Sequence, residues 1–268
     1  MSFLRWAGSK RQLIPILSSL WYASRGSERR SKYIEGFCGS AALFFSVQPR
    51  RSVLIDCNTA LIDCIRRIQV APQNVAQALS KLVVNEKNYY EIRALDLLSM
   101  DPDFSAARFI YLNRLCFNGL YRTNAAGKFN VPYGGWKAGR LPDKDQILRA
   151  STALRHTKIV NGDFEIAVQN SVGENDFVYL DPPYAVRNKS LDFQYGPDVF
   201  GTEDIKRLSN LADAIDAVGA TFVISYVDCP EIACLIDRWG CERVQVRRTV
   251  AAKVSKRTSV SEVLITNL

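Results

Sequence analysis

Hydrophobic and polar residues alternate along this chain with two periods, one typical of strands and one typical of helices. Short apolar runs, each long enough for a buried strand, lie at residues 33–35, 51–56, 158–164, 177–180, 221–226, 244–250 and 262–266. Apolar residues at three- and four-residue spacing predict helices at 202–218, where Thr202 is the expected N-cap, and at 230–239. The pattern predicts an open α/β sheet, closed by an antiparallel hairpin of its last two strands around a basic loop at 253–257.

This alternation of strands and helices lapses between residues 59 and 150. Four helical patterns come first, at 60–68, 74–84, 89–100 and 106–116. A hairpin with a Gly-containing turn is predicted next, at 117–137, and it is dense in Arg, Asn, Lys and aromatic residues. Arg can bond guanine, Asn can bond adenine and a ring can wedge between bases, although a polar surface hairpin has the same composition. We therefore predict a discontinuous domain of residues 1–58 and 151–268, interrupted by a mostly helical recognition domain of residues 59–150.

Four predicted strands end at acids: Glu35, Asp56, Asp163 and Asp181. The carboxyl ends of parallel strands share one edge of a sheet, which is where such sheets bind ligands. The small residues after Glu35 let a ligand approach the backbone, although no G-x-G-x-x-G loop is present. Asp56 stands where an acid commonly takes ribose hydroxyls, and a helix-capping role there is compatible with that one. Four converging acids suit a nucleoside-type ligand with a nearby positive charge, such as the sulfonium of S-adenosylmethionine.

The tetrapeptide Asp181-Pro182-Pro183-Tyr184 is the most specific motif of the chain. Asp181 and Pro182 each precede a proline, which favours extended backbone, and neither proline has an N–H to donate. The expected result is a stiff strand exit that offers a carboxylate, carbonyl oxygens and an aromatic face. An exocyclic amino group on a planar base needs two acceptors and a stacking surface of this kind. A proline-rich turn without chemistry is the alternative for the tetrapeptide alone.

Composition narrows the classes of function. The 268 residues are 47% hydrophobic and 23% charged, as in a soluble globular protein, and no apolar run reaches membrane-spanning length. Residues 1–5 lack the apolar core of a signal peptide, which predicts a cytoplasmic protein. Seven cysteines without a C-x-x-C pair, and the single His156, argue against zinc and against a Ser-His-Asp triad, so no metal is expected. The net charge of +8 favours a polyanionic partner.

In this order, and over nearly the whole chain, the motifs resemble the Dam-type, D12-class family of site-specific DNA adenine-N6 methyltransferases. The resemblance implies a Rossmann-like methyltransferase sheet with a DNA-recognition insert, double-stranded DNA as partner, and S-adenosylmethionine as donor, leaving S-adenosylhomocysteine. Residues 3–10 resemble the N-terminal donor motif, and Asp163 matches the acid that accepts the donor's adenine amino group. The implied donor contacts are Trp6, Lys10, Glu35, Phe37, Gly39, Asp56, Asp163, Phe164 and Asp181.

The target-recognition part of the family resembles residues 113–114, 117–122 and 129–134, and its C-terminal Arg and strand resemble Arg257 and residues 262–265. The resemblance implies that Arg122 reads a guanine and that Phe117 wedges into the duplex, within a GATC or other GAT-containing site. The implied DNA contacts are Arg114, Phe117, Asn118, Arg122, Asn124, Lys128, Asn130, Pro132 and Arg257.

The implied reaction moves a methyl group to N6 of an adenine flipped out of the duplex. Asp181 and the Pro182 carbonyl would each accept one N–H of the amino group, and Tyr184 would stack on the base. Two departures from the family pattern, Gly36 for a proline and Ala41 for a glycine beside the donor pocket, keep open a DNA-binding protein with weak or no catalysis. An RNA adenine or a protein glutamine is the other alternative target. We expect a monomer in the bacterial or phage-infected cytoplasm, at the nucleoid, and the sequence leaves a cognate restriction endonuclease open.

Overall fold

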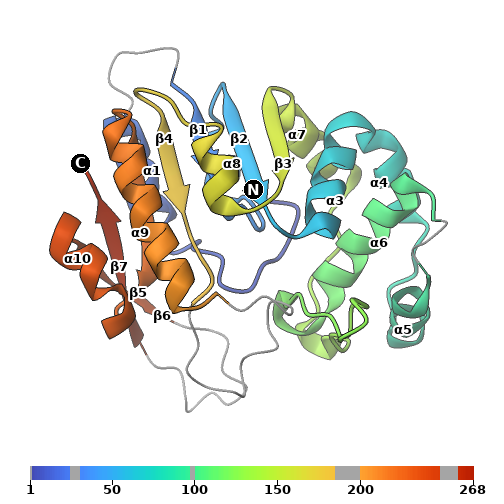
Figure 1. The fold of residues 1–268 in the computed structure, drawn as a ribbon. Coiled ribbons are helices and arrows are strands. Elements are labelled where there is room, and N and C mark those ends of the chain that lie inside the picture. Colours follow the sequence, from blue (N-terminus) through green and yellow to red (C-terminus); the bar gives the residue numbers. More distant parts are fainter. Residues whose placement is uncertain (1, 25–30, 97–99, 185–199, 248–258) are drawn as a thin grey trace.

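The computed structural model describes residues 2–24, 31–96, 100–184, 200–247 and 259–268. Within these ranges, seven strands form one mixed sheet in the order β3-β2-β1-β4-β5-β7-β6 (Figure 1). The strands from β3 to β5 are parallel, and β7 runs antiparallel to both β5 and β6. The predicted α/β sheet with a closing antiparallel pair is confirmed. The strands are β1 (Tyr33–Glu35), β2 (Ser52–Asp56), β3 (Thr157–Asn161), β4 (Phe177–Leu180), β5 (Thr221–Val227), β6 (Glu242–Arg247) and β7 (Ser259–Thr266).

The strand order changes direction between β1 and β4. These strands are neighbours, with Tyr33 opposite Phe177 and Glu35 opposite Tyr179. A doubly wound sheet opens a crevice at such a switch point, outside the carboxyl ends of its strands. The register therefore places Glu35 and the residue that follows β4, Asp181, at the same edge.

Alternate residues of the strands face two separate hydrophobic layers. Tyr33 and Phe177 face the layer that contains α1 (Ile14–Ser24) and α2 (Ala42–Val47). Ile34 and Val178 face the opposite layer. That layer is formed by α8 (Phe164–Gln169), α9 (Thr202–Ala217) and α10 (Ala233–Trp239), and a short η3 (Pro230–Ile232) precedes α10. Both faces of the sheet are covered, as the near-continuous apolar runs of the parallel strands require.

The inserted segment forms a group of helices beside the β3 edge of the sheet, on the right of Figure 1. Asn58 begins this group, because its side chain accepts a 3.1 Å hydrogen bond from the Leu61 amide at the start of α3. The apolar faces of these helices continue the layer of α1 and α2 without a break. The helices are α3 (Thr59–Val70), α4 (Pro72–Ser80), α5 (Glu86–Ala94), α6 (Pro102–Leu115) and α7 (Lys144–Leu154), with short η1 (Phe117–Gly119) and η2 (Gly135–Lys137).

The predicted hairpin at 117–137 is less regular than the sequence pattern indicates. Antiparallel pairing there consists of two isolated bridges among the described residues, Cys116 to Tyr133 and Thr123 to Phe129. Asn118 adopts a left-handed conformation, with φ of 54°, inside η1. This turn, together with Pro132, which has no N–H, prevents a continuous ladder.

Several predicted boundaries were wrong, and α7 and α8 were not predicted. The strand predicted at 158–164 ends at Asn161, because the Asp163 side chain accepts hydrogen bonds from the Glu165 and Ile166 amides and starts the unpredicted α8. Thr202 is the first residue of α9 and not its cap, which is Gly201. The helices predicted at 74–84 and 89–100 end sooner, at Ser80 and Ala94, and α7 was not predicted. Among the described residues, no helix is long and apolar enough to cross a membrane.

Candidate active site

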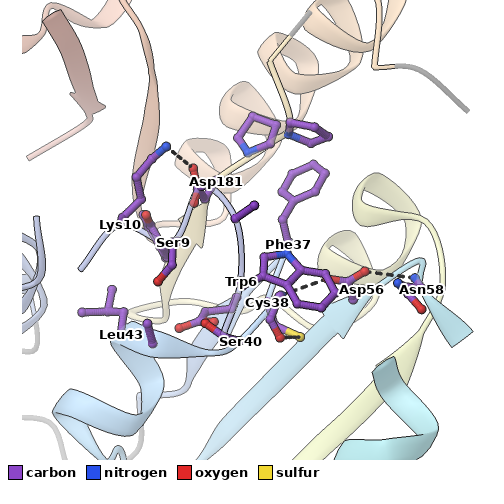
Figure 2. Close-up of a pocket in the computed structure, with 18 of the residues that line it drawn as sticks. Trp6, Ser9, Lys10, Phe37, Cys38, Ser40, Leu43, Asp56, Asn58 and Asp181 are labelled. Atoms are coloured by element: carbon purple, nitrogen blue, oxygen red, sulfur yellow. Dashed lines mark hydrogen bonds and ion pairs between the residues drawn. The ribbon is translucent and has the colours of Figure 1, made fainter. Parts of the chain in front are cut away.

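A cavity lies at the carboxyl ends of β1, β2 and β4, next to the switch point (Figure 2). Its walls come from residues 6–10, from the loops after β1 and β2, and from the strand exit at 181–184. One residue of the inserted segment, Tyr121, also lines it. Of the expected site residues, the structure brings together Trp6, Lys10, Glu35, Phe37, Gly39, Asp56, Asp181, Pro182 and Tyr184 around this cavity.

Asp181 has polar partners from two distant parts of the chain. The Lys10 ammonium lies 3.0 Å from Asp181 Oδ1, with both side chains largely buried. The Ser225 hydroxyl on β5 donates a 2.9 Å hydrogen bond to the same oxygen. Ser225 in turn shares a 2.9 Å hydrogen bond with the Tyr179 hydroxyl. Lys10 and Ser225 therefore fix the orientation of the carboxylate.

Tyr184 is fixed in the same way. Lys10 Nζ donates a 2.5 Å hydrogen bond to the Tyr184 hydroxyl and lies 4.7 Å from the ring centroid. The Tyr184 hydroxyl donates at 3.0 Å to Glu262 Oε1 on β7. Tyr226 packs edge-on against the ring, with centroids 5.3 Å apart. These contacts hold one aromatic face at the strand exit.

Burial and neighbouring charges shift the pKa values of the groups in this cluster. Burial lowers the pKa of Lys10, but Asp181, Tyr184 and Glu262 outweigh that effect, so its pKa is raised above the usual value. Burial raises the pKa of Asp181, and the Lys10 ammonium opposes this rise. Burial also raises the pKa of Tyr184, which keeps its hydroxyl neutral and able to donate. A fixed cation beside Asp181 favours the carboxylate form of that residue.

Glu35 is the most deeply buried acid of the cavity. Its Oε1 accepts hydrogen bonds from the Tyr33 hydroxyl and, at 2.8 Å, from the Phe44 amide. Burial nevertheless raises the pKa of Glu35 to about 8. Burial thus favours the protonated form of this carboxyl group, and a positive charge placed beside it would favour its ionisation.

Asp56 and Gly39 connect the loops after β2 and β1. Asp56 Oδ2 accepts a 2.9 Å hydrogen bond from the Gly39 amide, and Oδ1 accepts one of 3.0 Å from the Asn58 amide. The cap of α3 is consequently Asn58 and not Asp56. Gly39 has φ of +45°, and a Cβ there would lie 2.8 Å from the Trp6 indole, so only glycine fits beneath this ring.

The departure at Ala41 has a smaller effect on the cavity than its sequence position indicates. Ala41 is fully buried with φ of 50°, and its amide donates to the Cys38 carbonyl. Among the described residues around the cavity, Ala42 lines it and Ala41 does not. The Ala41 methyl group therefore lies next to the lining and is not part of it.

Asp163 and Phe164 lie outside the cavity lining. The Asp163 carboxylate pairs with the Arg207 guanidinium at 2.5 Å, and Arg207 also bonds Glu165 at 2.7 Å. Phe164 stacks on Phe37, which does line the cavity, with centroids 4.8 Å apart. The structure thus connects Phe164 to the cavity through Phe37, while Asp163 is occupied by its own ion pair.

The expected DNA contacts gather around the irregular hairpin, below α6 in Figure 1. Arg122 Nε donates a 2.6 Å hydrogen bond to Asn130 Oδ1, so Asn130 fixes the direction of the guanidinium. Asn124 Oδ1 accepts from the Lys128 amide at 2.9 Å and closes the turn. The other expected contacts are Arg114, which bonds the Arg140 carbonyl, Phe117 and Asn118 on η1, and Pro132, whose carbonyl accepts from Phe117. Arg257 lies outside the described residues.

Ser225, Glu262 and Tyr121 belong to this site, and the residue pattern alone did not assign them a role. Ser225 interrupts the buried apolar residues of β5, and Glu262 is an acid directly before the apolar residues 263–265 of β7. A lone polar residue in a buried strand was a signal that could have drawn attention to both, since buried polar groups need partners.

Comparisons with known proteins agree with this geometry. Residues 6–250 match the model of the family described as D12 class N6 adenine-specific DNA methyltransferase. The chain is 35% identical to Type II methyltransferase M1.LlaDCHI of Lactococcus lactis subsp. cremoris, over 99% of this chain and 94% of that protein. It is 32% identical to Type II methyltransferase M.MjaIII of Methanocaldococcus jannaschii, over 99% and 98%. It is 30% identical to a DNA adenine methylase of Escherichia coli K12, over 98% and 94%.

Proposed function

The chain belongs to the D12 class of N6 adenine-specific DNA methyltransferases, and on this premise we propose how its cavity performs the reaction. The methyl donor is S-adenosylmethionine, and the acceptor is the amino group of an adenine flipped out of double-stranded DNA. The observation that carries the proposal is the buried cluster of Asp181, Lys10 and Tyr184 at the exit of β4.

The residues around the cavity fit this donor. The donor is cationic at its sulfonium and at its amino group, and three carboxyl groups, Glu35, Asp56 and Asp181, line the cavity. Gly39 exposes its backbone because it has no side chain, and the Trp6 indole lies beside it. Together they form a surface that suits a flat nucleoside. Asp56 stands at the end of β2, the position from which an acid takes ribose hydroxyls in nucleoside-binding sheets. When bound, S-adenosylmethionine supplies an electrophilic methyl group.

Asp181 and the Pro182 carbonyl receive the amino group of the base. The N6 lone pair of adenine is delocalised into the ring, which makes this nitrogen a poor nucleophile. Two acceptors at tetrahedral-like angles favour a pyramidal nitrogen and direct its lone pair out of the ring plane. As the nitrogen gains positive charge in the transition state, the fixed Asp181 carboxylate stabilises that charge. Asp181 need not be a strong base, because the proton can leave after the transfer.

Lys10 and Tyr184 prepare the receiving site. Lys10 keeps Asp181 ionised while the site holds no base, since its ammonium lies 3.0 Å from Oδ1. The ring of Tyr184, held by Lys10 and Glu262, provides the stacking surface for the flipped base. Its hydroxyl remains neutral because burial raises the pKa of Tyr184.

The target site is read by the irregular hairpin. In this proposal Arg122, whose guanidinium is oriented by Asn130, bonds a guanine, and Phe117 wedges into the duplex. The resemblance of residues 117–134 to readers of GATC supports a GATC or other GAT-containing site. Sequencing DNA from cells that express the chain, with modified adenines identified, tests this choice directly.

The relatives from L. lactis and M. jannaschii are named Type II methyltransferases. This supports a role for the chain in a type II restriction-modification system in the cytoplasm. Its counterpart there would be a cognate endonuclease. A monomer is the proposed form, since each duplex site then needs one recognition segment and one cavity. Gel filtration with light scattering measures the mass, and a stable dimer would contradict this part of the proposal.

Transfer of tritiated methyl groups tests the reaction itself. Label is expected in unmethylated duplex DNA, and not in RNA, protein or DNA already methylated at N6 of adenine. Asp181→Ala should abolish transfer while donor and DNA still bind, and Asp145→Asn, an exposed acid on α7, serves as the matched control. Near-normal turnover in Asp181→Ala would refute the assignment. Binding of DNA without any label in the unchanged protein would favour the DNA-binding protein without catalysis.

A further inference from the structure

Trp6 lies between two parts of the molecule that have separate tasks in the proposed reaction. On one side its indole covers Gly39, where an added Cβ would come within 2.8 Å of the ring. On the other side it stacks on Tyr121, with ring centroids 5.9 Å apart and planes 19° from parallel. Both aromatic residues line the cavity. Trp6 therefore touches the loop after β1 and the inserted segment at the same time.

Tyr121 is connected to the groups that are placed to read DNA. It directly precedes Arg122 in the chain, and its ring packs against Phe109 on α6 and Phe129 in the hairpin, with centroids 5.8 and 5.7 Å apart. Asn58, which caps α3 and whose amide holds Asp56, lines the same cavity as Tyr121. A displacement of the hairpin that moves Tyr121 must therefore also act on the cavity wall.

The chain on both sides of Trp6 is fixed to the inserted segment through its backbone. The Arg5 amide donates to Asn113 Oδ1 at 2.9 Å, and the Arg5 carbonyl accepts from Asn113 Nδ2 at 2.6 Å. The Ala7 amide donates to the Gly119 carbonyl at 3.3 Å. Residues 5–7 thus follow the position of α6 and η1, while their middle side chain forms part of the cavity.

We propose that the Tyr121–Trp6 stack couples the two binding events, so that a bound target duplex tightens donor binding and a bound donor tightens site recognition. Tyr121 is then a positioning residue, which acts on the donor through Trp6 and on the bases through Arg122. The proposal rests on the proposed function, since it assigns the cavity to the donor and the hairpin to DNA. By linkage, the factor by which DNA strengthens donor binding equals the factor by which donor strengthens DNA binding.

A binding cycle measures this factor. The dissociation constant of S-adenosylhomocysteine is determined by calorimetry, with and without a saturating short duplex that carries one GATC site, or whichever site the adenine map identifies. We expect the product to bind the unchanged protein roughly tenfold tighter when the duplex is present, within the usual range of coupling factors. In Tyr121→Leu this factor should fall below about twofold, while Tyr121→Phe, which keeps the stack, should retain it.

Two further variants secure the interpretation. Trp6→Leu breaks the same stack from the other side, so it should also remove the coupling even if Tyr121→Leu fails to fold. Tyr90→Leu removes an exposed ring from α5 of the inserted segment and should leave both coupling and methyl transfer unchanged. A factor of one in the unchanged protein, or a full factor in both Tyr121→Leu and Trp6→Leu, would overturn the proposal while leaving the proposed function intact. If the unchanged protein bound no S-adenosylhomocysteine and transferred no methyl group, the proposed function itself would fail.

Discussion

The Ser225 hydroxyl on β5 donates a 2.9 Å hydrogen bond to Asp181 Oδ1, the oxygen that also faces the Lys10 ammonium. Ser225 is fully buried, and its own oxygen is held by the Tyr179 hydroxyl. A carboxylate with one oxygen fixed in this way presents its remaining acceptor positions in a constant direction. Orientation of Asp181 is therefore built into the β4–β5 pair and precedes substrate binding.

Ser225→Ala should lower kcat by roughly 10- to 100-fold, because a buried hydrogen bond to a charged group contributes about 1.5–3 kcal/mol. The Michaelis constants for donor and DNA should change by less than about threefold, since Ser225 orients Asp181 without lining the cavity. Ser52→Ala is the matched control, because Ser52 is also a buried hydroxyl on a strand, bonded to Thr157 far from Asp181. A kcat in Ser225→Ala within twofold of the unchanged protein would contradict this role.

The free energy of unfolding should depend on pH in the way that the ionisation of Glu35 predicts. Its folded pKa of about 8 lies above the value of about 4.3 for an unfolded glutamate, so between these values the folded state binds more protons than the unfolded state. The free energy of unfolding should therefore fall as pH rises from about 4.5 to 8. Urea titrations at pH 5.5 and 8 should show a smaller fall in Glu35→Gln, which cannot ionise. An equal fall in both proteins would place the pH dependence elsewhere, for example at Asp56.

Two variants of Asp163 should separate the contribution of its N-cap to stability from the contribution of its ion pair. Asp163→Ala loses the N-cap of α8 and the partner of Arg207, and we expect it to cost about 1–2 kcal/mol of unfolding free energy. Asp163→Asn keeps an N-cap and loses only the charge, so its cost should be less than half as large. Denaturant unfolding of the two variants makes the comparison. If Asn were as destabilising as Ala, the salt bridge and not the cap would be the dominant contribution.

Site recognition should depend on Asn130 as well as on Arg122. Arg122→Ala should weaken binding of the cognate duplex by about 1–3 kcal/mol and relax the choice of one base pair. Asn130→Ala leaves the guanidinium without its 2.6 Å partner, so the ratio of cognate to substituted-site binding should fall in the same direction by a smaller factor. Lys128→Ala is the control, because loss of a phosphate contact weakens all duplexes about equally and reduces the salt dependence. Uniform weakening in Asn130→Ala would show that Asn130 does not act through Arg122.

The sequence predicted the cavity best where a general rule of sheet topology applies. The acids at the ends of β1, β2 and β4 could be placed together because parallel strands share one carboxyl edge. The ion pair of Asp163 could not be predicted, because its partner, Arg207, lies on α9 and is distant in the chain. The irregular form of the hairpin was not predicted, because the left-handed conformation of Asn118 and the close approach of Gly119 to Arg5 depend on tertiary packing that no local pattern indicates.

The contact between Trp6 and Tyr121 illustrates the same limit. Each residue belongs to a recognisable motif, but their stacking depends on the path of the inserted segment back to the sheet. Ser225 and Glu262 needed the strand order as well, because β5 and β7 are adjacent only in the folded sheet. Composition and periodicity describe elements, whereas these contacts depend on tertiary register.

Assembly of the charged cluster has a consequence for the growing polypeptide. Lys10 is made early in synthesis, while Glu262 lies on β7, the strand that follows all the others and inserts between β5 and β6. Until that strand emerges from the ribosome, β5 has a free edge, and Tyr184 and Lys10 lack their shared carboxylate partner. A nascent chain can thus fold the cavity walls before the stacking surface of Tyr184 is fixed. The buried cluster is therefore completed last, when β7 takes its place between β5 and β6.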